Sequence, residues 1–230
     1  MGEIESGVFG ILRNILEQKV NFENISHNIA NINTNAFKKA LIYYSFEPSK
    51  SKSVIDLSQG PIFKTGNPLD VAIEGRGFFK IKTQRGIRCT RDGAFLINRE
   101  GILVTKRGDI VLGQNGEINV QGQRVEIKDD GTVVVDGEIR GKIAVIDFER
   151  QDKIIKEGFN YYRYSGDERE IVNSKEFNLR QGYLEGSNVS PTEEMVKLIE
   201  TLRTFESLEN SLHIIDDMNR KLINDPILIQ

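Results

Sequence analysis

Apolar residues near the N-terminus recur at alternating steps of three and four, interrupted only at Gln18. This is the spacing of the a and d positions in a coiled coil. The pattern predicts a long amphipathic helix over about residues 4–33. Its apolar positions are Ile4, Val8, Ile11, Ile15, Phe22, Ile25, Ile29 and Ile32.

A second helix is predicted near the C-terminus, over about residues 192–223. It opens with Ser190-Pro191-Thr192-Glu193, which places a capping hydroxyl before a proline at the first helical position, with a glutamate three residues after the serine. The apolar stripe has an irregular phase between Phe205 and Leu208, which would overwind a supercoil locally. Its members are Met195, Leu198, Leu202, Phe205, Leu208, Leu212, Ile215 and Leu222.

The N-terminal pattern also contains a row of amide side chains, about 110° around the helix from the apolar row. Its members are Asn14, Asn21, Asn24, Asn28, Asn31 and Asn35. Because asparagine is a weak helix former, this row favours a helix that neighbouring chains complete, with the amides pairing across a second interface. The alternative is an ordinary helix pair within one chain, with solvated asparagines.

The middle of the chain alternates short β-branched or aromatic runs with turn residues, which predicts antiparallel β structure. Asp92-Gly93, Asn115-Gly116, Asp130-Gly131 and Asp136-Gly137 are strong turn signals. The expected strands are residues 78–82, 95–97, 102–104, 109–112, 125–127, 132–135 and 142–146.

The predicted fold class is therefore α+β, with long terminal helices forming a coiled-coil layer and an antiparallel β-rich middle. Residues 47–68 are rich in serine and lysine with three prolines, and are expected to form an extended connector. The expected domains are residues 1–46, the connector 47–68, the β-rich domain 69–188 and the C-terminal helix 189–230.

Composition narrows the class of protein. The 230 residues are 38% hydrophobic and 28% charged with a net charge of −3, so no basic surface for nucleic acid is indicated. No apolar run is long enough for a lipid-spanning helix, and the N-terminus lacks the order of a cleaved secretory signal. The single cysteine, Cys89, excludes an intramolecular disulfide and a thiolate metal cluster.

Candidate catalytic features are weak, so no catalytic residue, metal site or cofactor is expected. Gly75-Arg76-Gly77 lacks a third glycine and precedes a strand, unlike a dinucleotide loop. The acidic residues of 129–138 miss calcium-loop spacing. His27 and His213 stand alone in predicted helices, and Asp216 and Asp217 diverge by about 100° around theirs.

Four sequence blocks, in order along most of the chain, resemble the flagellar basal-body rod and hook family. They are Ala30-Asn31-Ile32-Asn33-Thr34-Asn35-Ala36-Phe37-Lys38, Gly66-Asn67-Pro68-Leu69-Asp70-Val71-Ala72-Ile73-Glu74-Gly75-Arg76-Gly77-Phe78-Phe79, Thr90-Arg91-Asp92-Gly93-Ala94-Phe95 and Gln181-Gly182-Tyr183-Leu184-Glu185-Gly186-Ser187-Asn188-Val189. The first seven residues differ from the usual opening of this family, and Ala36 stands where glycine is common.

The resemblance implies a non-enzymatic axial protein whose terminal helices form the inner layer of a hollow tube. It implies self-association, other rod and hook-side axial proteins as partners, the flagellar type III export apparatus, and a rod that spans the periplasmic space. The short middle resembles rod members more than the hook subunit. The short segment after the first helix favours the proximal rod type that adjoins the distal rod, with the distal type second.

The assembly seam is expected at the apolar helix positions given above, among them Ile25 and Leu202, and we expect it to transmit torque. The competing hypothesis is an oligomeric surface-binding module whose β domain recognises carbohydrate or protein. Its signature would be exposed aromatic side chains clustered in one groove, such as Tyr161, Tyr162 and Tyr164.

Overall fold

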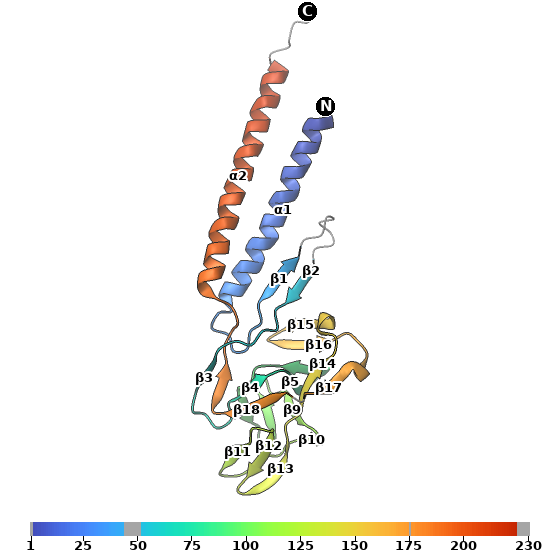
Figure 1. Ribbon diagram of the computed structural model, residues 1–230, viewed down its shortest axis with the longest axis vertical. Coiled ribbons are helices and arrows are strands. Elements are labelled where there is room, and N and C mark those ends of the chain that lie inside the picture. The colour runs from blue at the N-terminus through green and yellow to red at the C-terminus, as the bar shows by residue number, and fades with distance from the viewer. Residues whose placement is uncertain (1, 44–51, 175, 225–230) are drawn as a thin grey trace, which may run out of the picture. The chain divides into compact units, whose positions relative to one another are not determined.

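The computed structural model describes residues 2–43, 52–174 and 176–224, and the chain divides into two compact units. The helical unit comprises Met1–Ala30, Ala40–Val54 and Ser190–Gln230. The β unit comprises Asn31–Lys39 and Ile55–Val189. The fold is α+β, with a β-rich middle and a helix at each end of the chain (Figure 1).

Two long helices form most of the helical unit. Helix α1 spans Gly2–Ala30 and helix α2 spans Pro191–Asn224. They pack side by side and run in opposite directions (Figure 1). Strands β1 (Ala40–Tyr43) and β2 (Lys52–Ile55) pair as a small separate sheet. The two helices therefore pair within one chain.

The start of α2 follows the predicted capping signal. Pro191 is the first helical residue, so its missing N–H falls where a helix has no internal acceptor. The Ser190 hydroxyl accepts a hydrogen bond from the Glu193 N–H at 3.5 Å, and the Ser190 carbonyl accepts one from the Glu194 N–H at 3.0 Å. The cap thus satisfies exposed amides of the first turn.

Helix α1 ends three residues before the predicted boundary. After Ala30 the chain makes a turn in which the Thr34 N–H donates to the Asn31 carbonyl at 3.1 Å. Ala36 then adopts φ 51°, a left-handed conformation that stops helical continuation. As a result Asn31, Ile32 and Asn35 lie beyond the helix, although the sequence pattern had placed them on it.

The main sheet of the β unit has ten strands, and its strand pairs in the described part of the chain are antiparallel. Its central path runs β15-β16-β6-β5-β9-β8-β7, with β10 beside β9, β14 beside β5 and β17 beside β14. The bounds are β5 Phe78–Thr83, β6 Gly86–Thr90, β7 Phe95–Ile97, β8 Leu103–Thr105, β9 Ile110–Gly113, β10 Gly116–Glu117, β14 Val145–Phe148, β15 Ile154–Gly158, β16 Tyr161–Tyr164 and β17 Ile171–Asn173.

Three smaller sheets complete the unit: β11-β12-β13, β18-β4 and β19-β3. Their bounds are β3 Ile62–Lys64, β4 Val71–Gly75, β11 Val125–Ile127, β12 Thr132–Val135, β13 Glu138–Lys142, β18 Phe177–Gln181 and β19 Tyr183–Glu185. The turn between β12 and β13 is the predicted Asp136-Gly137 pair, with φ values of 52° and 89°. Both residues adopt the positive φ of a type I′ hairpin.

One predicted strand is divided differently in the structure. The run expected over residues 142–146 is split, because β13 ends at Lys142 and β14 begins at Val145. Between them Ile143 makes an isolated bridge to Gly113 of β9. The chain changes sheet at this point, and a local hydrophobic run does not reveal such a change.

The segment expected as an extended connector carries strands. Residues 44–51 lie outside the described residues, but β2 and β3 occupy parts of the remaining segment. Strand β3 pairs with β19 from the other end of the domain, and Gly60 is buried. Residues 55–68 therefore group with the β unit.

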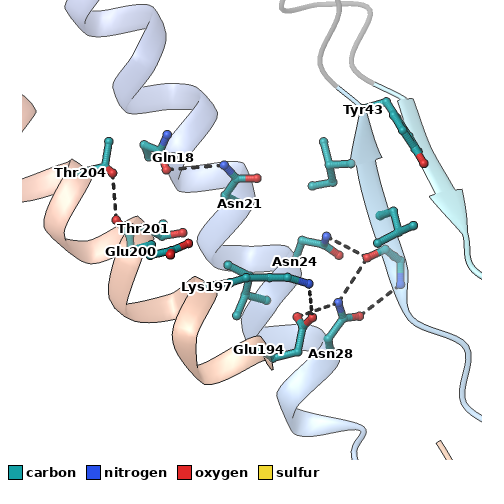
Figure 2. Close-up of a pocket in the computed structure, with 14 residues that line it drawn as sticks. Gln18, Asn21, Asn24, Asn28, Tyr43, Glu194, Lys197, Glu200, Thr201 and Thr204 are labelled. Atoms are coloured by element: carbon teal, nitrogen blue, oxygen red, sulfur yellow. Dashed lines mark hydrogen bonds and ion pairs between the residues drawn. The ribbon is translucent and has the colours of Figure 1, made fainter. Parts of the chain in front are cut away.

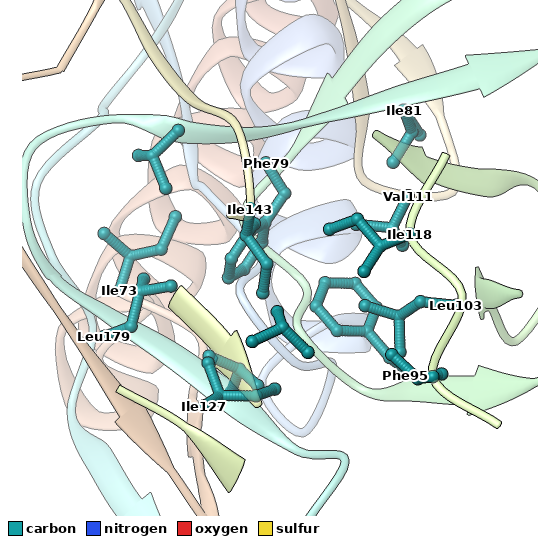
Figure 3. Close-up of a cluster of buried hydrophobic side chains, with 14 of the residues drawn as sticks. Ile73, Phe79, Ile81, Phe95, Leu103, Val111, Ile118, Ile127, Ile143 and Leu179 are labelled. Carbon is teal, nitrogen blue, oxygen red and sulfur yellow. The ribbon is translucent and has the colours of Figure 1, made fainter. Parts of the chain in front are cut away.

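The principal core of the β unit gathers apolar side chains from most of its strands (Figure 3). Phe79 and Phe95 meet edge to face at 5.0 Å between ring centroids. Ile73 and Leu179 bring in β4 and β18. A smaller cluster surrounds the buried Tyr162 ring, which contacts Phe78 at 5.5 Å. These clusters fix the strands that carry the family-like sequence blocks.

Candidate assembly surfaces

The contact between the two helices uses much of the apolar stripe predicted on α1. Ile25 is buried, and Val8, Ile11, Ile15 and Ile29 are half-buried. Phe22, by contrast, is 42% exposed. After Gln18 the burial shifts to neighbouring positions, because 3.6 residues per turn drifts against a strict heptad.

The buried face of α2 follows a regular heptad that includes polar residues. Glu194 and Thr201 are buried, and Leu198, Leu208, Leu212 and Ile215 continue the same steps of four and three as half-buried side chains. Phe205 completes the series but is 39% exposed. Met195 and Leu202 lie outside this face and are exposed. The irregular phase read from apolar residues alone disappears once Glu194 and Thr201 are counted.

Helix α1 carries a second apolar stripe, which the sequence analysis missed. Phe9, Leu12, Leu16 and Val20 follow steps of three, four and four, and Phe9 is 78% exposed. Leu16 lies about 180° around the helix from the buried Ile25. We call these four residues the outer stripe of α1. The signal was present in the sequence as a helix with apolar residues on two opposite faces.

Helix α2 has an outer stripe of mixed character. Met195, Ile199 and Leu202 are exposed apolar residues, and Glu206 and Glu209 continue the same alternation of four and three. Ile199 lies about 180° from the half-buried Leu208. We call these five residues the outer stripe of α2. It is apolar in its first half and acidic in its second.

Several amides of the predicted row act inside the chain (Figure 2). The side-chain NH₂ groups of Asn24 and Asn28 donate to the Ala40 carbonyl at 3.0 and 3.2 Å, and the Ala40 N–H donates to Asn28 Oδ1 at 3.2 Å. Asn28 also donates to Glu194 Oε2 at 3.1 Å. Asn28 thus joins α1, β1 and α2.

These amides line a groove of about 490 Å³ between α1, α2 and β1. Asn21 donates to Gln18 along its wall at 3.5 Å, and Lys197 Nζ lies 2.7 Å from Glu194 Oε1. Asn14 is exposed. Polar residues outnumber apolar ones along the groove, and several of them are hydrogen-bonded, so specific hydrogen bonds hold the helix pair at this end together with apolar packing.

A cluster of three buried charges lies in the β unit. Glu185 accepts from Lys38 Nζ at 2.6 Å and from Arg91 Nε at 2.8 Å, and also from the Gly60 N–H at 2.9 Å. All three charged side chains are almost fully buried. We call Lys38, Arg91 and Glu185 the buried charge cluster.

The cluster explains why the family-like blocks contain these residues. The Arg91 guanidinium also donates to the carbonyls of Ile73, Gly75 and Gly77 at 2.8–3.0 Å. Gly75 and Gly77 have φ values of 102° and 126°, which side chains rarely adopt. All four sequence blocks therefore meet at one buried site.

Burial lowers the pKa of Lys38, although the Glu185 carboxylate opposes this effect. Burial also raises the pKa of the Tyr162 hydroxyl. An ammonium and a guanidinium share one carboxylate here, so the carboxylate is indispensable to the charge balance of the site.

Other residues of the family-like blocks form hydrogen bonds that connect residues 36–39 to residues 185–188 of the β unit. Asn188 accepts from the Lys39 N–H at 2.7 Å and donates its own N–H to the Phe37 carbonyl at 3.1 Å. Ala36 donates its N–H to the Glu185 carbonyl at 2.8 Å. The Phe37 ring is buried beneath Lys156 Nζ, 3.5 Å from its centroid.

The remaining block residues have structural positions. Ala30 ends α1, and Thr34 donates its hydroxyl to the Asn31 side chain. Phe78, Phe79 and Ser187 are buried, Tyr183 is half-buried, and Gly182 has φ 79°.

The structure shows how the candidate metal-binding and aromatic residues named above are placed. Within the described residues, no group of three His, Cys, Asp or Glu side chains could hold a metal ion. Tyr162 is buried, and Tyr161 donates to Asp109 Oδ2 at 2.8 Å. Tyr164 stacks on Phe148 at 4.8 Å. These tyrosines do not form an exposed aromatic groove, so the surface-binding hypothesis is not favoured.

Comparison with known families identifies two matching regions. The family described as "Flagellar hook protein FlgE/F/G D1 domain" matches residues 72–135. The family described as "Flagellar basal body rod FlgEFG protein C-terminal" matches residues 180–225. These regions contain Arg91 and Glu185 of the buried charge cluster. In the described part of the chain, no helix is both long and apolar enough to span a membrane.

Whole-chain relatives extend this similarity. The flagellar basal-body rod protein FlgF of Caulobacter vibrioides is 34% identical over 221 residues, covering 86% of this chain and 89% of the relative. FlgG of Buchnera aphidicola subsp. Schizaphis graminum is 31% identical over 246 residues, covering 89% and 94%. FlgG of Bacillus subtilis is 31% identical over 240 residues, covering 87% and 91%. The FlgG alignments are longer for a similar share of this chain, so they contain more gap positions.

Proposed function

The chain belongs to the flagellar basal-body rod protein family, and we propose that it assembles into the rod through the outer faces of its terminal helices. As a rod component it is a structural protein that assembles with other rod components. The proposal adds that its helices form the inner coiled-coil layer of a tube that transmits torque from motor to hook.

The observation that carries the proposal is the outer stripe of α1. This stripe, formed by Phe9, Leu12, Leu16 and Val20, is exposed on the face of α1 opposite to the face that packs against α2. Burying a side chain of this size contributes about 1.5–3 kcal/mol. A contiguous exposed stripe of this kind is typical of a protein contact surface. The helices of neighbouring subunits would cover it.

Dense helix packing also accounts for the mechanical role. Rotating one subunit against the next would require repacking of close-fitting side chains, and interiors of protein density resist such changes. The apolar side chains at the contact between α1 and α2 contribute to this role indirectly, because they hold the two helices together so that both outer faces are presented. They include Val8, Ile15, Leu198 and Leu212.

We further propose that the chain leaves the cytoplasm through the flagellar type III export apparatus without a cleaved signal peptide, and that its rod spans the periplasmic space. Four asparagines within α1, at positions 14, 21, 24 and 28, weaken that helix in isolation. The terminal helices would then fold fully only on docking. Hydrogen exchange on the isolated chain tests this point, since full protection of α1 amides would contradict it.

Within the family we propose the proximal rod type that adjoins the distal rod. The chain is short after its first helix, and its alignments to FlgG relatives carry additional gap positions. Localisation of the chain along isolated rods by labelled antibody tests this placement, and a position beside the hook would contradict it.

A charge on the outer stripe tests the assembly proposal. We expect Leu16→Asp to abolish rods and swimming, because a carboxylate cannot be buried against a neighbouring apolar helix. The control is Asn14→Asp, which adds the same charge at an exposed position off the stripe. Motility in soft agar and electron microscopy of isolated basal bodies give the result. Normal rods with Leu16→Asp would refute the role of the outer stripe.

A further inference from the structure

The hairpin between β15 and β16 presents an aromatic side chain in a strained position. Phe159 is 73% exposed and has φ 51°, followed by Asn160 with φ 59°. A two-residue turn with two positive φ values favours Asn-Gly, and a bulky residue at its first position is unusual. An exposed, strained aromatic residue suggests selection for contact rather than for folding.

Arginines surround this aromatic tip. The Arg107 guanidinium carbon lies 3.8 Å from the centroid of the Phe159 ring, a cation–π geometry. Phe159, Arg85, Arg88 and Arg107 line a hollow of about 280 Å³. We call these four residues the Phe159 surface.

The charge of this surface is only partly balanced. Arg88 Nε pairs with Glu157 at 2.6 Å, but Glu157 also pairs with Arg163 Nε at 2.7 Å. Asp109 also lines the hollow, but among the described residues no carboxylate forms an ion pair with Arg85 or Arg107. The surface therefore fits a partner that offers apolar side chains beside carboxylates.

The outer stripe of α2 has this composition. Met195, Ile199 and Leu202 supply exposed apolar side chains, and Glu206 and Glu209 follow on the same face. Within the described chain, neither Glu206 nor Glu209 forms an ion pair, whereas Glu194 and Asp216 do. Residues 191–230 hold eight acidic residues against four basic ones.

We propose that the Phe159 surface of one subunit binds the outer stripe of helix α2 of a second copy. Phe159 lies against the apolar half, and Arg85 and Arg107 lie against Glu206 and Glu209. Because the two surfaces differ, the contact is head-to-tail, the kind that builds open helical assemblies. The inference rests on the proposed rod assembly and names the partner surface for α2, separately from the outer stripe of α1.

Photocrosslinking in assembled rods tests the contact. A photoreactive phenylalanine analogue replaces Phe159 in cells that also make a differently tagged copy, and basal bodies are purified after irradiation. We expect crosslinks from position 159 to residues 191–224 of the other copy. Crosslinks within one chain, crosslinks to a different protein, or normal rods without any crosslink would each overturn the proposal.

Charge reversal gives an independent readout. Arg107→Glu should reduce rod yield by at least about tenfold, as expected for a contact at the centre of an interface. Glu209→Arg in the same chain should restore the yield, because each subunit then offers the reversed pair. Failure of the second change to restore rods, with both variants folded, would overturn the pairing.

A third variant separates contact from folding. Phe159→Asn removes the ring but suits the left-handed turn conformation. We expect an unchanged or higher unfolding midpoint together with a loss of rod yield similar to that of Arg107→Glu. Normal rod yield with Phe159→Asn would overturn this inference. If Leu16→Asp still abolished rods in that case, the proposed assembly through the outer stripe of α1 would stand.

Discussion

Glu185→Gln should destabilise the β unit by about 3–5 kcal/mol, the usual consequence of removing one partner from a buried ion pair. The wild-type carboxylate accepts three hydrogen bonds, two of them from the cations Lys38 and Arg91. A glutamine keeps one acceptor oxygen and turns an NH₂ group toward one cationic donor. Against a total stability of about 5–15 kcal/mol, this loss is large.

The pH dependence of this variant has a defined sign. Burial already places the folded pKa of Lys38 below its unfolded value, so the native state loses this proton more readily than the unfolded state. The free-energy cost of burying the protonated Lys38 is complete at pH values below its folded pKa. This cost is relieved as pH rises toward the pKa of Lys38 in the unfolded state. Because the Glu185 carboxylate raises the pKa of Lys38, its removal lowers the folded pKa further. The deficit in stability relative to wild type should therefore shrink as pH rises toward the unfolded pKa of lysine.

Urea unfolding followed by labelling of Cys89 measures this effect in the β unit, because that thiol is buried there. The matched control is Glu74→Gln, which removes a carboxylate 2.9 Å from Arg180 in an exposed ion pair. The control should change stability by less than about 1 kcal/mol. A loss of that small size for Glu185→Gln, or a deficit that grows with pH, would refute the reasoning.

Three further outcomes are expected. The Cys89 thiol, whose pKa burial raises to about 12, should resist alkylation in the native protein and react only on unfolding; rapid labelling without denaturant would contradict its burial. Gly93→Ala should prevent stable folding, because the new methyl would lie 1.7 Å from the Val71 carbonyl oxygen, and native thermal unfolding would disprove this. Asn28→Ala should cost the helical unit about 1–3 kcal/mol by circular dichroism melting, since the buried Glu194 loses a donor; an unchanged melt would contradict the role of Asn28.

Helices and turns whose signals lie within a few neighbouring residues were predictable from the sequence. The two helices and the Ser190-Pro191 cap follow from spacing and capping chemistry that act within a few residues. Hairpins with Asp-Gly turns, such as Asp136-Gly137, were equally clear. The end of α1 was placed too late because its apolar period continues to Ile32, while Ala36 and its backbone bond to Glu185 impose a different path.

Pairings between distant segments were not predictable. Strand β4 meets β18 about a hundred positions later, and its run Val71-Ala72-Ile73 has no alternation that would mark it as a strand. The role of Glu185 depends on two cations elsewhere in the chain, which a single sequence does not connect. The outer stripe of α1 was visible in the sequence but was hidden by the assumption that a helix has one apolar face.

Residues far apart in the sequence are hydrogen-bonded in both units, and this has a consequence for biosynthesis. Asn28 and Glu194 are 166 positions apart, and Lys38 and Glu185 are 147 apart. At ribosomal speeds of about 5–20 residues per second, the first helix emerges roughly ten seconds or more before its partners exist. During translation its apolar and amide faces are therefore uncovered, so the nascent chain offers a chaperone an accessible N-terminal segment until synthesis is nearly complete.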